Sequence, residues 1–112
     1  MELKVALIQS PLAWENPTKN REHFSKKLDT LNGEVDLVIL PEMFTTAFTM
    51  TPWNVPKEEG EETVKWMQKE AERKKMALTG SMVYFADGHY YNRLWFVEPD
   101  GKSIFYDKRH TF

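Results

Sequence analysis

The 112 residues carry 15 Lys and Arg against 17 Asp and Glu, a formal net charge of −2, and so lack the basic excess of a protein that binds nucleic acid through its phosphates. No apolar run approaches the ~20 residues needed to cross a bilayer. The chain has no cysteine, which excludes disulfides, thiolate metal sites and an internal cysteine nucleophile. With 41% hydrophobic and 13% aromatic residues, it is expected to fold as one small domain or as part of a larger one.

The first half of the chain predicts a strand, a helix and a second strand. Residues 3–9 are mostly apolar and β-branched, as in a strand. The Asn-Pro pair at 16–17 is typical of a helix start, and apolar spacing continues the helix over 18–31, where Asn-Gly at 32–33 is expected to end it. The uninterrupted apolar run 37–40 predicts a strand buried on both faces, as in a parallel sheet covered by helices.

The second half predicts a long loop, a helix and three strands. Three prolines in residues 41–57 indicate an irregular loop, and loops of that length are often functional. A helix over 59–75 begins with acidic residues and ends with basic ones, which complements the helix dipole. The strands are expected over 77–84, 90–97 and 103–106, with a hairpin turn at 86–88. The whole pattern, β-α-β-α-β-β-β, places the chain in the α/β class.

The first candidate catalytic group is Glu42, which directly follows the strand 37–40. In open α/β sheets, ligands bind outside the carboxyl ends of the strands. Apolar neighbours would partly desolvate this carboxyl group and raise its pKa toward the range useful for a general base. The alternative is a surface glutamate in a loop or a helix cap. Phe44 and Phe48, in the loop after Glu42, are expected to border any pocket there.

The second candidate is Lys108, which follows the strand expected at 103–106. An ammonium group near a reacting carbonyl can stabilise the negative charge that develops on its oxygen. The alternative is a solvated charge cluster. Because Glu42 and Lys108 each follow a strand, and a hairpin separates them, they could converge on one crevice of the sheet.

Two other chemistries are weaker. The three histidines, His23, His89 and His110, lack the spacing of a metal site, so no metal is expected. Ser81 could act as a nucleophile with Lys108 as its base. However, it lacks both the G-x-S-x-G and the S-x-x-K patterns, so an ordinary strand residue is expected.

Taken together, these blocks resemble the N-terminal part of the nitrilase, or carbon–nitrogen hydrolase, superfamily, most closely its omega-amidase-like branch. The resemblance extends over essentially the whole chain. It rests on these motifs: Lys4-Val5-Ala6-Leu7-Ile8-Gln9, Leu40-Pro41-Glu42-Met43-Phe44, Gly80-Ser81, Tyr91-Asn92-Arg93, Pro99-Asp100-Gly101, and Tyr106-Asp107-Lys108-Arg109-His110-Thr111-Phe112.

The resemblance implies an αββα sandwich and a Glu-Lys-Cys mechanism without metal or cofactor. Glu42 would be the general base, and Lys108 would stabilise the tetrahedral intermediate. Phe44, Phe48 and His110 would contact a small omega-amide such as 2-oxoglutaramate, which is hydrolysed with release of ammonia. The resemblance also implies a cytoplasmic enzyme that forms dimers or larger oligomers, with neither nucleic-acid nor membrane partners.

The chain departs from this family pattern because it has no cysteine. The family nucleophile follows the lysine motif, and the sequence stops at Phe112 within that motif. We therefore expect residues 1–112 to be the N-terminal portion of a longer hydrolase domain and to be inactive alone. The alternative is a non-catalytic, nitrilase-like half domain that binds a partner or ligand. In either case, uncovered sheet faces and unpaired strand edges are expected to make the isolated chain associate.

Overall fold

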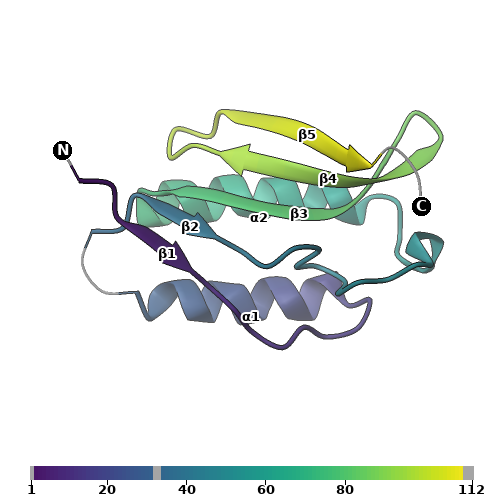
Figure 1. Ribbon diagram of the computed structural model, residues 1–112, viewed down its shortest axis with the longest axis horizontal. Helices are drawn as coiled ribbons and strands as arrows, with labels where there is room; N and C mark the ends of the chain where they lie inside the picture. Colours follow the sequence, from purple (N-terminus) through teal and green to yellow (C-terminus); the bar gives the residue numbers. More distant parts are fainter. Residues whose placement is uncertain (1, 32–33, 110–112) are drawn as a thin grey trace.

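The computed structural model describes residues 2–31 and 34–109, which form a five-stranded sheet and two α-helices (Figure 1). The neighbour order in the sheet is the chain order, β1-β2-β3-β4-β5. The first three strands are parallel to one another, and β4 and β5 continue the sheet as antiparallel strands. The elements are β1 (Val5–Leu7), α1 (Pro17–Asp29), β2 (Leu37–Ile39), the short 3-10 helix η1 (Pro52–Asn54), α2 (Glu59–Lys74), β3 (Ala77–Ala86), β4 (His89–Val97) and β5 (Ser103–Arg109).

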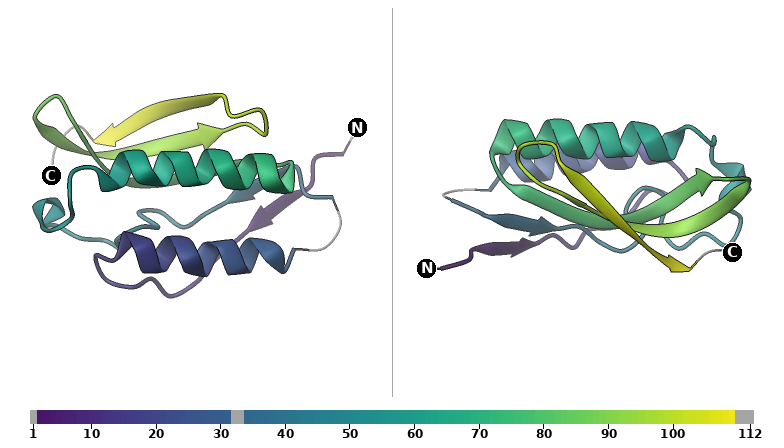
Figure 2. Two further views of the ribbon diagram at one scale, coloured as in Figure 1. Left: turned by 180° about the vertical axis from the view of Figure 1, so that it is seen from behind. Right: turned by 90° about the horizontal axis from the view of Figure 1, so that it is seen from above.

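Both helices lie on one face of the sheet, as the two further views show (Figure 2). The core lies between the helices and the sheet. Alternate strand residues point to this face and pack against the apolar stripes of the helices. The α/β class expected from the sequence is confirmed. The buried core residues are Ile8, Phe24, Leu28, Val38, Leu40, Phe44, Met67, Ala71, Met76, Leu78, Met82, Trp95 and Val97.

The opposite face of the sheet carries no helix among the described residues (Figure 2). Val38 points into the core and is fully buried, whereas its neighbours Leu37 and Ile39 are only half-buried. The expectation that β2 is buried on both faces is therefore wrong for this chain, because helices cover one face only. Val5 and Leu7 of β1, which pair with Leu37 and Ile39, lie on the same uncovered face.

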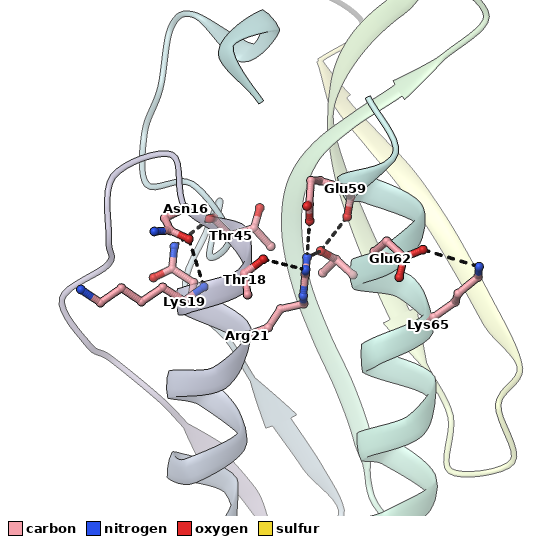
Figure 3. A network of polar contacts seen from close by, with 10 residues as sticks. Asn16, Thr18, Lys19, Arg21, Thr45, Glu59, Glu62 and Lys65 are labelled. Atoms are coloured by element: carbon pink, nitrogen blue, oxygen red, sulfur yellow. Dashed lines mark hydrogen bonds and ion pairs between the residues drawn. The ribbon is translucent and has the colours of Figure 1, made fainter. Parts of the chain in front are cut away.

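The N-terminus of α1 is fixed by polar contacts that the sequence indicated (Figure 3). The side chain of Asn16 accepts a hydrogen bond from the Lys19 N–H at 3.1 Å, and Pro17 takes the first helical position, so this helix start is confirmed. Arg21 reaches from α1 to α2, where it donates to Glu59 at 2.7 Å and to Thr63 at 2.9 Å. These contacts hold the two helices side by side.

The predicted helix 59–75 and the hairpin strands are confirmed, but the last strand is longer than expected. β5 extends to Arg109 rather than ending near residue 106, because Asp107 and Arg109 still pair with β4. Lys108 therefore lies inside a strand and not after one. The helix end expected at residues 32–33 lies outside the described residues; the last helical residue of α1 is Asp29.

Candidate active site

The segment after β2 follows the neighbouring strand β3 closely, which fixes the position of Glu42. The N–H of Leu40 donates to the carbonyl of Thr79 at 2.8 Å, and the N–H of Phe44 donates to the carbonyl of Ser81 at 3.1 Å. Between them, the N–H of Met43 donates to Ser81 Oγ at 2.9 Å, and Met43 has a left-handed φ of 50°. A non-glycine residue rarely adopts this conformation, so Ser81 holds a strained turn next to Glu42.

Gly80 allows this close approach. A Cβ atom there would lie 2.9 Å from Phe44 Cδ1 and 3.0 Å from Leu40 Cβ, too close for any side chain without movement. The Phe44 ring instead packs into the core, 5.7 Å from the ring of Phe24 and 5.9 Å from that of Trp66. Phe44 is fully buried, and its ring is part of the core. Its contact with a substrate stays a prediction.

Lys108 is placed by an irregularity in the ladder between β4 and β5. Asp107 lies opposite Arg93 and Arg109 lies opposite Asn92, so Lys108 has no residue directly across from it. Such a bulge bends the strand and redirects a side chain, which is why bulges are common next to active sites.

The structure brings Glu42 and Lys108 together although 66 positions separate them in the sequence. Lys108 Nζ donates a hydrogen bond to Glu42 Oε1 at 2.8 Å. The two side chains are 38% and 37% exposed, so solvent reaches the ion pair. Chemically, the pair offers a carboxylate that can accept a proton and an ammonium group that can donate hydrogen bonds to a developing anion.

The other side chains considered for the site differ in exposure. Phe48 is 65% exposed, whereas Ser81 is 2% exposed and its hydroxyl already accepts the Met43 N–H, which does not suit a nucleophile. His110 lies outside the described residues. Across residues 2–31 and 34–109, no cluster of His, Asp and Glu has the geometry of a metal site.

One surface hollow of the described residues lies apart from this pair. A hollow of about 390 Å³ lies on the β4–β5 hairpin, lined by Phe96, Glu98, Lys102, Ser103 and Ile104, and includes neither Glu42 nor Lys108. None of the helices in this part of the chain is both long and apolar enough to cross a membrane.

Sequence reasoning did not assign a role to the ion pair directly beside Lys108. Arg93 on β4 donates to Asp107 on β5, with Nε–Oδ1 and Nη2–Oδ2 distances of 2.7 and 3.2 Å. The sequence does contain a pattern that indicates this ion pair. Arg93 is a charged residue within a strand, and the aromatic residues Tyr91 and Trp95, two positions before and after it, lie on the same face of the strand. A charge at such a position needs a partner, and Asp107 on the next strand supplies it.

The sheet with two helices on one face is an α/β scaffold, and the Glu42–Lys108 ion pair supplies polar groups suited to acyl chemistry. The sequence profile of the carbon-nitrogen hydrolase family matches residues 4–112, and the chain belongs to that family. The omega-amidase YafV of Escherichia coli K12 is 36% identical over 110 residues, which cover 98% of this chain and 42% of that protein. The chain thus spans less than half the length of this curated relative.

Solved structures share this fold. XC1258 from Xanthomonas campestris, a CN-hydrolase superfamily protein with an arsenic adduct in its active site, superposes with a TM-score of 0.87 and 38% identity, covering 98% of this chain and 42% of that one. A carbon-nitrogen hydrolase from Helicobacter pylori G27 superposes with a TM-score of 0.81 over 96% of this chain and 40% of its own. At 20% identity, the second likeness concerns the fold alone.

Proposed function

We propose that residues 1–112 are the N-terminal portion of a carbon–nitrogen hydrolase domain and supply two of its three catalytic groups. The observation that carries this proposal is the 2.8 Å contact between Lys108 Nζ and Glu42 Oε1. An ion pair as exposed as this one contributes only about 0–1 kcal/mol to stability, so stability alone is a weak reason for its placement. Membership of the carbon-nitrogen hydrolase family supports a catalytic role for the pair.

In the proposed reaction, Glu42 is the general base and accepts the proton of a thiol. The thiolate attacks the amide carbon, and the Lys108 ammonium group stabilises the oxyanion that forms. The C–N bond then breaks, the nitrogen takes the proton held by Glu42, and ammonia leaves a thioester that water hydrolyses. The chain has no cysteine, so the thiol must come from a segment outside these 112 residues.

We propose a small omega-amide, such as 2-oxoglutaramate, as the substrate. The support is the 36% identity to omega-amidases over 98% of the chain. Phe48, whose side chain is exposed in the loop after Glu42, remains a candidate substrate contact. His110 is a further candidate substrate contact, proposed from its position in the sequence alone.

The test uses the complete gene product that contains these residues, assayed for ammonia release from 2-oxoglutaramate. Glu42→Gln and Lys108→Ala should each lower kcat by at least about 100-fold, the usual cost of losing a general base or an oxyanion donor. Lys102→Ala is the matched control, because Lys102 lies on the same hairpin and its ion pair is with the exposed Asp100. Turnover at the wild-type rate in either site variant would refute the assigned roles.

A second candidate function is a non-catalytic half domain that binds a ligand or partner, which the lack of cysteine in the chain favours. Translating the gene beyond codon 112 separates the two proposals. A cysteine on a predicted strand within a few tens of residues supports the hydrolase. A stop codon directly after Phe112 supports the binding module, and the purified chain should then release no ammonia.

A further inference from the structure

We propose that Arg93 is a positioning residue that, through Asp107, holds Lys108 against Glu42. This inference rests on the proposed function, because it assigns Arg93 a part in catalysis only if Lys108 has one. It concerns an ion pair on β4 and β5 that does not itself contact Glu42.

Arg93 is held more tightly than a surface arginine would be. The residue is only 8% exposed, and its guanidinium carbon lies 3.9 Å from the centre of the Phe105 ring. The rings of Tyr84 and Tyr91 lie 4.6 and 5.2 Å from the same atom. Aromatic rings around a desolvated cation attract it and fix the plane of the guanidinium group.

The fixed guanidinium group in turn fixes Asp107. Two nitrogens of Arg93 donate to the two carboxylate oxygens of Asp107, a bidentate arrangement that sets both the distance and the orientation of the carboxylate. Because Asp107 is 26% exposed at its side chain and Arg93 is 10% exposed, solvent screens this pair less than the Glu42–Lys108 pair.

The position of Asp107 determines where the bulge falls. Asp107 is the last residue of β5 in regular register with β4, and the register shifts directly after it. Anchoring Asp107 opposite Arg93 leaves Lys108 as the extra residue, and its Nζ lies 2.8 Å from Glu42 Oε1. Without the anchor, the end of β5 could slip by one residue, which would turn Lys108 to the other face.

The substitution Arg93→Lys tests this geometry most directly. Lysine keeps the charge and can remain among the rings, but it cannot make the bidentate contact. We expect crystal structures of the complete gene product to show the Lys108 Nζ–Glu42 Oε1 contact of 2.8 Å lost in Arg93→Lys and in Asp107→Asn. Arg73→Lys is the matched control, because Arg73 also bridges two carboxylates, Glu70 and Asp29, but between the helices.

The kinetic readout separates positioning from general stability. A displaced Lys108 should lower kcat by about 100-fold, with KM changed less than about twofold, because the lost interaction acts in the transition state. The double variant Arg93→Lys/Asp107→Asn should lose no more activity than either single variant, because both act through one contact. Arg73→Lys should leave kcat per folded molecule unchanged.

The inference is overturned if folded Arg93→Lys and Asp107→Asn proteins keep the Lys108–Glu42 contact, or if they keep the wild-type kcat while Lys108→Ala abolishes turnover. Failure of the proposed function gives a different result, namely an active Lys108→Ala variant. In that case the crystal structures still decide whether Arg93 positions Lys108.

Discussion

At the scale of single residues, Ser81 shapes the turn that carries Glu42. Its hydroxyl oxygen accepts the Met43 N–H at 2.9 Å, and the serine is 2% exposed. We predict that Ser81→Ala lowers the free energy of unfolding by about 1–3 kcal/mol, because it leaves a buried N–H without an acceptor. Urea denaturation of the complete gene product measures this loss. Ser103→Ala, on half-buried β5 surface, is the control and should change stability by less than about 0.5 kcal/mol.

Ser81 also has a predicted effect on one amide proton. The Met43 N–H, protected by the hydroxyl acceptor, should exchange with solvent faster in Ser81→Ala than in the wild-type protein, whereas the Leu40 N–H, which donates to Thr79, should not change. Unaltered protection of Met43 would contradict the role given to the hydroxyl.

The contacts that Glu15 makes with the loop after Glu42 depend on pH. The hydrogen bond from the Thr49 hydroxyl lowers the pKa of Glu15 most, partial desolvation opposes it, and Thr51 and Asn54 lower the pKa further. A carboxyl group whose pKa is lower in the folded state stabilises that state above its unfolded pKa of about 4.3. This stabilisation is lost as the pH falls through the folded pKa of Glu15.

We therefore predict that the contacts of the loop weaken in acid. The NMR signals of Thr49 and Thr51 should shift together as the pH falls below about 4.3, and the shift should be missing in Glu15→Gln, which has no group to protonate. The same acid-dependent shift in Glu15→Gln would show that another group causes it.

At the scale of elements, α2 ends at a strained residue. Lys75, the residue after its last turn, has φ 55° and ψ 48°, the left-handed conformation that glycine adopts without strain. We predict that Lys75→Gly raises the free energy of unfolding by about 0.5–1 kcal/mol, because relief of this strain exceeds the added entropy of glycine in the unfolded chain. Urea denaturation measures the change. Lys69→Gly, at an exposed position inside the helix, should instead destabilise the protein by about 1 kcal/mol.

The elements whose signals are local could be predicted from the sequence. The Asn-Pro pair at 16–17 and the charge pattern of 59–75 act within one helix, and both helices form where expected. The Asp87-Gly88 turn also acts locally, since both residues take the positive φ that a tight hairpin needs. In each case the residues that specify the element lie within it.

The features that could not be predicted depend on contacts between distant residues. β5 extends past residue 106 because Arg93 of β4 pairs with Asp107, a partner 14 positions away. Phe44 enters the core because Gly80 of β3 leaves room for its ring. The position of Glu42 after a strand could be predicted, but the bulge that directs Lys108 toward it depends on the register of two strands, and no local pattern encodes that register.

At the scale of the whole molecule, the sheet has one broad apolar face on which no helix of residues 2–31 and 34–109 lies. Residues that alternate with the core positions of β1 and β5 point to this face, among them Leu7 at 69%, Ile104 at 71% and Tyr106 at 67% exposure. Exposed apolar surface of this kind is typical of an interface, and the outer edges of β1 and β5 are open to further strand pairing.

We predict that the 112-residue chain on its own associates through this face. Analytical ultracentrifugation should find dimers or larger species at micromolar concentration. Ile104→Glu should shift the distribution toward the monomer, because a charge on the helix-free face is costly to bury. Thr18→Glu is the control: it adds the same charge on α1, on the helix layer, and should leave the distribution unchanged. A monodisperse wild-type monomer that melts cooperatively would contradict the prediction, because it would show that the exposed apolar face does not drive association.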